Sequence, residues 1–195
     1  MNSSKKDQLL LSALRAVASA VNRRDPYTSG HSERVAEYCD RLAISLNLSQ
    51  DHRYFLSLSA WLHDLGNLST PRYILRKPSA LLHEEMEEVR VHPIKGAEML
   101  AAEPGLFEVA NAIRHHHERF DGTGYPDRLV GEAIPFFSRI ILVADAYEAI
   151  THDRAYRPAV PYTAALDRLK EGAGTQFDPA IVKAFVNAME QTEGR

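Results

Sequence analysis

The sequence has very little cysteine and no long apolar run. Cys39 is the only cysteine among 195 residues, so no disulfide can form within the chain, which agrees with a reducing compartment. No apolar stretch approaches the roughly 20 residues that a membrane-spanning helix needs. Arg15 interrupts the apolar stretch near the N-terminus before it reaches the length of a signal-peptide core, about 7–15 residues. We therefore expect a cytoplasmic protein with no membrane span.

The sequence also lacks a strong excess of charge of either sign. Its formal net charge is −3, which creates no broad field that would attract nucleic acid or anionic membranes. We expect no nucleic-acid partner, and an anionic substrate would have to be held by local cations or metal ions. Hydrophobic residues make up 45% of the chain and charged residues 25%, a composition typical of a soluble globular domain.

Alternating strand patterns are nearly absent, and apolar residues recur at helical spacing instead. The pattern predicts a single all-α domain, a helical bundle of about seven to nine helices with long loops. The loops hold most of the proline and glycine, at 71–79 and 121–135. The expected helices cover the N-terminal 1–24, about 32–47, one ending at Gly66, 84–91, 93–102, 106–115, 137–150, one that begins at Pro161 and one that begins at Asp178-Pro179.

Histidine is the residue type that points to chemistry, with nine copies in the chain. Four settings place histidine beside glycine, proline or an acid; they are His31 after Gly30, His63 next to Asp64, His92 before Pro93, and the run His115-His116-His117-Glu118. Asp145 adds a carboxylate within the apolar segment 137–150. An unpaired carboxylate in such a helix is costly to bury, so Asp145 needs a cation or strong donors.

These residue types fit a centre with two metal ions. Imidazole can only be a terminal ligand, whereas a carboxylate has two oxygens and can bridge. Two ions about 3.5–4 Å apart can clamp both sides of a phosphoryl displacement. Asp64 is the natural bridge, because His63 beside it can bind one of the two ions.

Each of these residues has a simpler structural explanation when it is taken alone. His63 could be a hydrogen-bonded structural histidine, His92 could start a helix, and three consecutive histidines could form a solvated face. Asp145 could pair with Arg139 or Arg154. The combination favours a metal site, because the segments that carry the residues can converge. Three further histidines, His52, His83 and His115, are expected at the surface or in a supporting role.

The motifs resemble those of the HD phosphohydrolase superfamily and, within it, the HD-GYP proteins. The residues that carry the resemblance are His31, His63-Asp64, His92-Pro93, the stretch from His116 to Pro126 that ends in Gly124-Tyr125-Pro126, Asp145, and Asp153-Arg154-Ala155-Tyr156-Arg157. The resemblance implies an HD-domain helical bundle over residues 25–195 with long active-site loops. Residues 1–24 would then form a helix that acts as a linker or in dimerisation.

The resemblance implies a metal-dependent phosphodiesterase that hydrolyses cyclic di-GMP to pGpG and/or GMP by attack of a metal-bound hydroxide on phosphorus. Two divalent ions are expected, iron or manganese first, with nickel and zinc as the alternatives. One ion would take His31, His63, Asp64 and Asp145. The other would share the bridging Asp64 and take His92, His116 and His117.

The resemblance also implies roles for residues around the metals. Arg154 and Arg157 match positions that hold substrate phosphate, and Asp25 would orient a water or a ligand. Glu148 stands where an aspartate is common and is expected on the substrate-binding side. The Gly124-Tyr125-Pro126 loop, with Tyr125 at its centre, would shape the rim of the active site and contact a diguanylate cyclase (GGDEF) partner. A homodimer is a further expectation.

The chain departs from the HD-GYP pattern at Asn67, where a lysine usually stands. Asn67 keeps a hydrogen-bond donor near the scissile phosphate but loses the positive charge, and removing one such contact can cost roughly 10²–10³ in rate. The alternative function is therefore a slow or inactive metal-binding receptor or interaction module. A phosphohydrolase for another nucleotide is a third reading, disfavoured by the Gly-Tyr-Pro motif and the arginine pair. Tyr27 stands where a trimetal subset has glutamate, which favours two metals.

Overall fold

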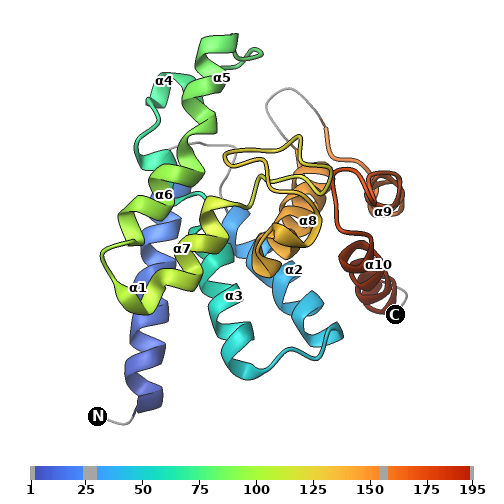
Figure 1. The fold of residues 1–195 in the computed structure, drawn as a ribbon, viewed down its shortest axis with the longest axis horizontal. Coiled ribbons are helices and arrows are strands. Elements are labelled where there is room, and N and C mark those ends of the chain that lie inside the picture. The colour runs from blue at the N-terminus through green and yellow to red at the C-terminus, as the bar shows by residue number, and fades with distance from the viewer. Residues whose placement is uncertain (1–2, 24–29, 154–157, 194–195) are drawn as a thin grey trace.

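The computed structural model describes residues 3–23, 30–153 and 158–193, and these residues form an all-α domain. Figure 1 shows α8 and α2 near the centre, α9 and α10 on one side, and α4 and α5 as an arm at the opposite end from the N-terminus. The helices are α1 (Ser3–Asn22), α2 (His31–Ser45), α3 (Gln50–Leu62), α4 (Arg72–Leu75), α5 (His83–Arg90), α6 (His92–Leu100), α7 (Phe107–Arg114), α8 (Phe136–Thr151), α9 (Tyr162–Glu171) and α10 (Pro179–Glu193).

The predicted fold class is confirmed, and two local predictions are wrong. Within the described ranges, nine helices are longer than one turn, and the segment 71–79, expected to be a loop, contains the short helix α4. Helix α3 was expected to reach Gly66 but ends at Leu62. The chain then tightens into the 3-10 turn η2 (Leu65–Leu68). The tighter turn brings the backbone of Gly66 directly against α6, which a continuing α-helix would not do.

Two apolar clusters hold the domain together, and α3 lies between them. The larger cluster packs α2, α3, α8, α9 and α10 together through fully buried side chains such as Leu42, Ile140 and Phe185. The smaller cluster joins α1, α3, α6 and α7. Ala18 and Val21 of α1 are buried in it, so the C-terminal part of α1 packs onto the body of the domain. Phe55 and Trp61 of α3 contact both clusters.

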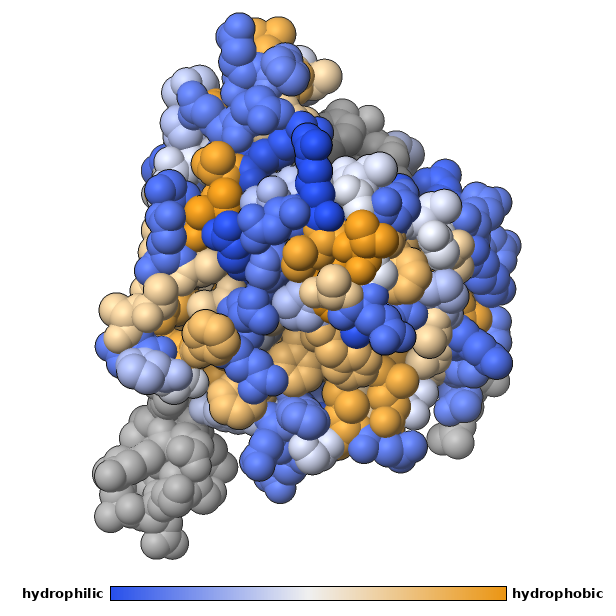
Figure 2. All heavy atoms as spheres, in the orientation of Figure 1, coloured by the Kyte–Doolittle hydropathy of each residue, from blue (hydrophilic) through white to orange (hydrophobic). Residues whose placement is uncertain are grey.

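Figure 2 shows one face of the molecule, on which hydrophilic residues surround apolar residues that gather in its middle and lower part. Exposed apolar side chains are normal on a folded protein. No helix in the described part of the chain is both long enough and apolar enough to span a membrane.

The backbone of Gly66 brings η2, which follows His63 and Asp64, close to α6, which begins at His92. A Cβ at Gly66 would overlap the carbonyl oxygen of His92 and lie 2.7 Å from the backbone nitrogen of Gly96. Only glycine allows this approach, so Gly66 holds the His63-Asp64 turn against the start of α6.

We expect Gly66→Ala to destabilise the protein by about 3 kcal/mol or more, because neither backbone can give way cheaply. The matched control is Gly105→Ala, since a Cβ at Gly105 would meet nothing within 4 Å. Urea unfolding of both variants measures the effect. Equal midpoints for the two variants would show that the close approach at Gly66 is unimportant.

Candidate metal centre

Helix ends place most of the chemistry-bearing residues. Gly30 adopts a φ of 73° before α2, a left-handed conformation that suits glycine, and His31 is the first residue of the helix. His63 directly follows α3, and His92 is the first residue of α6. His116 and His117 follow the end of α7 at Arg114. Asp145 differs, because it lies within α8.

The rings of three histidines are fixed by one repeated hydrogen bond. In His63, His92 and His116, Nδ1 donates to the carbonyl oxygen of the residue three positions earlier, at 2.8, 2.8 and 2.6 Å respectively. A carbonyl oxygen can only accept, so Nδ1 must carry the proton. In a neutral imidazole the other nitrogen, Nε2, then presents a lone pair. The backbone therefore sets both the orientation and the tautomer of these rings.

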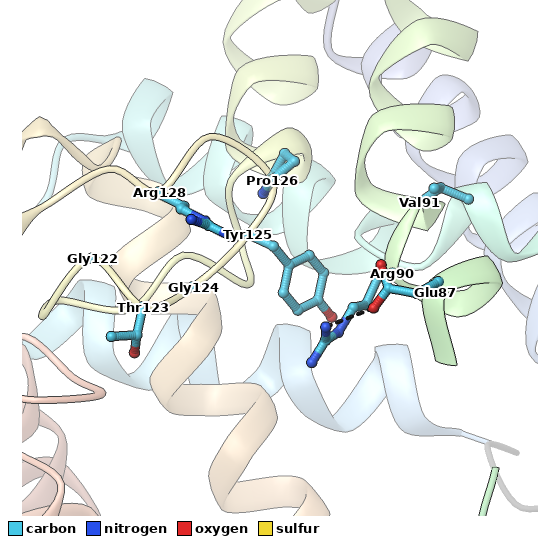
Figure 3. A pocket seen from close by; sticks show the side chains of 9 residues that line it. All are labelled: Glu87, Arg90, Val91, Gly122, Thr123, Gly124, Tyr125, Pro126 and Arg128. Atoms are coloured by element: carbon cyan, nitrogen blue, oxygen red, sulfur yellow. Dashed lines mark hydrogen bonds and ion pairs between the residues drawn. The ribbon is translucent and has the colours of Figure 1, made fainter. Parts of the chain in front are cut away.

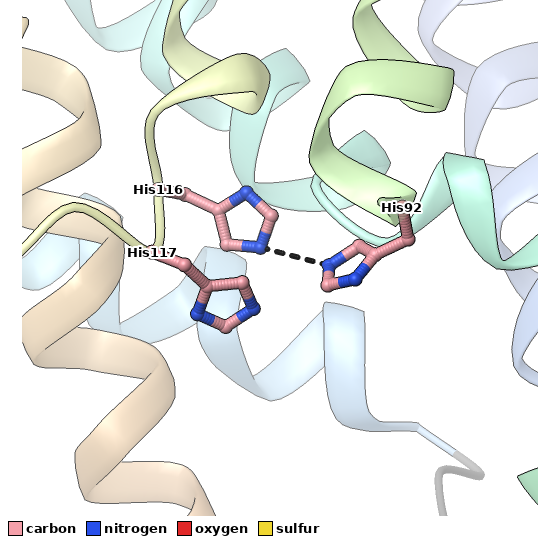
Figure 4. Close-up of side chains that lie close together, drawn as sticks. All are labelled: His92, His116 and His117. Carbon is pink, nitrogen blue, oxygen red and sulfur yellow. Dashed lines mark hydrogen bonds between the residues drawn. The ribbon is translucent and has the colours of Figure 1, made fainter. Parts of the chain in front are cut away.

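The Nε2 atoms converge in two clusters. His31, His63 and Asp145 form one, and His92, His116 and His117 form the other; within each cluster the potential ligand atoms lie within 4.8 Å of one another. Figure 4 shows the second cluster, with the His92 and His116 rings facing each other and His117 beside them. The Nε2 atoms are 3.2 Å apart in the pair His31–His63 and also in the pair His92–His116.

Burial keeps the second cluster neutral. It lowers the pKa of His92 and His116, and it lowers the pKa of His117 to about 4. Two neutral rings whose Nδ1 atoms are already protonated bring two lone pairs together at 3.2 Å. A cation between those nitrogens relieves this repulsion, so the donor set of the second cluster fits a metal ion.

The first cluster has more acidic surroundings. Burial by itself would lower the pKa of His31, but its hydrogen bond to Glu148 and the charges of Asp145 and Asp64 raise the pKa overall. Asp145 Oδ1 lies 3.3 Å from His31 Nε2. Imidazole nitrogens and carboxylate oxygens together suit divalent transition metals, so this donor set also fits a metal ion.

Asp64 lies between the two clusters and turns one oxygen to each. Its Oδ2 is 3.8 Å from His31 Nε2 and 3.6 Å from His63 Nε2, whereas its Oδ1 is 3.5 Å from His92 Nε2. Burial would raise the pKa of Asp64, but the surrounding imidazoles lower it well below its usual range. An ionised carboxylate in this position has the geometry of a bridging ligand.

Asn67 acts on Asp64 in the described structure. Its Nδ2 donates to Asp64 Oδ1 at 2.8 Å, and its own Oδ1 accepts from Thr70 Oγ1 at 3.5 Å. Asn67 thus orients the carboxylate from the side of the second cluster. Its place near the scissile phosphate stays a prediction.

Glu148, predicted on the substrate-binding side, contacts His31 and Arg34 in the structure. The side chain is fully buried, and its Oε2 accepts from His31 Nδ1 at 2.7 Å. Its Oε1 accepts from Arg34 Nε at 3.0 Å. Glu148 lies one helical turn after Asp145, on the same face of α8, so it orients His31. The role of Arg34 was missed, although Arg34 follows His31 by the same spacing on α2.

Glu118 holds the loop that contains Tyr125 through hydrogen bonds to the loop backbone. This role of Glu118 was not predicted from the sequence. Glu118 is buried and accepts from the backbone nitrogens of Asp127 at 2.6 Å and Leu129 at 3.2 Å. The Tyr125 ring lies 5.0 Å from the His117 ring, with 30° between their planes. Tyr125 is thus placed at the edge of the second cluster. The other predicted site residues lie outside the described residues; they are Asp25, Arg154 and Arg157.

The chain is similar to known proteins over most of its length. The HD domain family model matches residues 15–181. The chain is 38% identical over 182 residues to the cyclic di-GMP phosphodiesterase response regulator RpfG of Xanthomonas campestris, covering 92% of this chain and 48% of that protein. It is 37% identical over 183 residues to the 3'3'-cGAMP-specific phosphodiesterase 3 of Vibrio cholerae, covering 94% of this chain and 40% of that protein. The chain thus spans less than half the length of these relatives.

Solved structures share the fold. A crystal structure of V-cGAP3, a cyclic GMP-AMP-specific phosphodiesterase of V. cholerae, superposes with a TM-score of 0.74 at 20% identity, over 94% of this chain and 49% of that one. The HD domain of the phosphodiesterase PgpH of L. monocytogenes superposes with a TM-score of 0.61 at 16% identity, over 91% and 97%. The family resemblance predicted from the motifs is confirmed, and the chain belongs to the HD domain family.

Proposed function

We propose that this chain is a metal-dependent phosphodiesterase that hydrolyses cyclic di-GMP to pGpG and/or GMP. The observation that carries the proposal is Asp64, whose two oxygens face two separate clusters of ligand atoms. This arrangement suits a pair of divalent ions that act on one phosphodiester. Two relatives are named as phosphodiesterases of cyclic di-GMP and of 3'3'-cGAMP, and these names support a cyclic dinucleotide as the substrate.

The proposed ligand assignment follows the two clusters. His31, His63 and Asp145 would hold one ion, His92, His116 and His117 the other, and Asp64 would bridge them. Iron or manganese suits the mixed donors best, with nickel and zinc as the alternatives. When bound, the ions would supply Lewis-acid stabilisation of the phosphoryl charge and a nucleophile at neutral pH.

The chain's own residues would keep this site in shape. Glu148 and Arg34 fix His31, and Asn67 fixes Asp64. Asp25, Arg154 and Arg157 remain proposed substrate-side residues. A cytoplasmic location, a GGDEF partner at the Gly124-Tyr125-Pro126 loop and a homodimer remain proposals as well.

A slow or inactive receptor is the second candidate function. Asn67 favours it, since the amide is engaged with Asp64 and brings no positive charge to a substrate phosphate. The relatives, which are named phosphodiesterases, favour the enzyme. The two candidate functions differ in turnover, so a measurement of cyclic di-GMP hydrolysis separates them.

We expect Mn²⁺ to raise the thermal unfolding midpoint of the wild-type protein. Free Mn²⁺ at about 100 times its dissociation constant stabilises by about 2.7 kcal/mol, and Asp64→Ala should lose most of this gain because both ions share that carboxylate. Asp167→Ala is the control, because Asp167 is exposed, pairs with Lys170 and is not one of the proposed ligands. Calorimetry with elemental analysis measures both effects. An unchanged Mn²⁺ response in Asp64→Ala would contradict the bridging role.

We expect protein loaded with iron or manganese under anaerobic conditions to convert cyclic di-GMP to a linear product. Chromatographic separation of the products measures the reaction and distinguishes pGpG from GMP. Asp64→Ala should show no product above background. Tight binding of cyclic di-GMP with no linear product would instead establish the receptor.

We expect Asn67→Lys to raise kcat by roughly 10-fold to 100-fold at matched metal content, because it brings a cation to the developing phosphoryl charge. Asn67→Leu, which has a similar size but no donor, should lower metal content, because it leaves Asp64 Oδ1 without its 2.8 Å donor. Steady-state kinetics and elemental analysis of both variants measure these effects. If Asn67→Lys turns over at the wild-type rate, the missing charge does not limit the enzyme.

A further inference from the structure

A cavity of about 540 Å³ lies beside the second cluster, outside the proposed metal ligands. It opens between α5 and the loop 122–128, and its walls include Glu87 and Arg90 from α5 with Tyr125 and Arg128 from the loop. Figure 3 shows Tyr125 extending from the loop towards the pair formed by Glu87 and Arg90. Tyr125 also contacts the His117 ring, and this contact links the cavity to the second cluster. A cavity of this size is within the usual range for small-molecule sites, roughly 300–1,000 Å³.

The polar groups in the cavity form one acid–base pair with a further cation nearby. Arg90 Nη1 lies 2.8 Å from Glu87 Oε1, and about half of each side chain is exposed. An exposed pair of this kind contributes little to stability. The Arg90 guanidinium also lies 5.6 Å from the centre of the Tyr125 ring. Arg128 adds a second guanidinium from a backbone position with a φ of 55°, which is uncommon for a residue other than glycine.

This set of groups matches the hydrogen-bonding edges of guanine. Guanine presents two acceptors, O6 and N7, which arginine recognises with two parallel donors. On its Watson–Crick edge it presents N–H donors, which a carboxylate accepts. Adenine carries an amino donor in place of O6 and no hydrogen on N1, so it would bring a donor to Arg90 and an acceptor to Glu87. The Tyr125 ring, which the Arg90 guanidinium approaches to 5.6 Å, adds an aromatic wall to the cavity.

We propose that this cavity is a guanine-recognition site, in which Glu87 and Arg90 determine the base specificity of the enzyme. The proposal rests on the proposed cyclic-dinucleotide function and deepens it. The base would sit between α5 and Tyr125 while the phosphodiester lies at the metal centre on the far side of that ring. Arg128 would add positive charge for the anionic ligand, in a chain whose overall charge is −3. The pair forms the last turn of α5, so the start of α6 at His92 fixes its distance from the metal centre.

The test compares the affinity of the metal-loaded protein for cyclic di-GMP and for cyclic di-AMP by calorimetric titration. We expect the wild type to prefer cyclic di-GMP by roughly 10-fold to 100-fold, the range of a good bidentate base contact. Glu87→Gln should reduce that preference several-fold, because the amide replaces one carboxylate acceptor with a donor, and Arg90→Met should reduce it further. Glu88→Gln is the matched control, because Glu88 lies next to Glu87 on α5 and makes the same charge change without lining the cavity.

The ratio of affinities separates recognition from a structural role, since a loosened α5 would weaken both ligands alike. Equal affinities in the wild type, or an unchanged ratio in Glu87→Gln, would overturn the proposal. Turnover of cyclic di-GMP in the same preparations tests the proposed function separately. A preference for cyclic di-GMP without turnover would refute the proposed hydrolysis and support guanine recognition in the cavity. Turnover without that preference would support hydrolysis and refute guanine recognition. If the protein showed no binding and no turnover, both proposals would be refuted.

Discussion

The candidate centre depends on one repeated interaction, the hydrogen bond from a histidine Nδ1 to the carbonyl oxygen three residues earlier. It occurs at His63, His92 and His116, and in each case it uses a carbonyl at the end of a helix or turn. Because the proton is committed to Nδ1, Nε2 is left as a lone pair. Burial lowers the pKa of His92 and His116, so a metal cation is the partner that best satisfies the nitrogens of the second cluster. The backbone hydrogen bonds thus fix the rings in the tautomer that a metal ligand needs.

Helix ends make this interaction available, and a glycine brings the ends together. The last carbonyls of a helix have no intrahelical partner, and His63 and His116 use one such group each, directly after α3 and α7. The approach of Gly66 to α6 then sets the turn that carries Asp64 against His92. Asp145 enters from the side of α8, where Glu148 one turn later supports His31. The same two apolar clusters that stabilise the domain therefore fix the geometry of the site.

The fold class and the ligand types could be predicted from the sequence because their signals are local. Helical spacing of apolar residues, Pro93 after His92, and the adjacent His63 and Asp64 are all visible in short windows. The end of α3 could not be predicted, since it depends on packing between η2 and α6. The roles of Asn67 and Glu148 were also out of reach. A sequence shows which donors and acceptors exist. Only the fold shows that Asn67 donates to Asp64 and that the buried Glu148 accepts from His31.

The division between chemistry and recognition follows from where the charges lie. Imidazoles and the carboxylates of Asp64 and Asp145 surround the centre, so nothing in the described part of the cluster itself distinguishes one base from another. The guanidinium groups of Arg90 and Arg128 instead line the cavity between α5 and the loop 122–128. In a chain with a net negative charge, local cations of this kind add to the attraction that metal ions would exert on an anionic dinucleotide. Specificity can then change by substitution on α5 or the loop, while the backbone hydrogen bonds that define the metal centre stay the same.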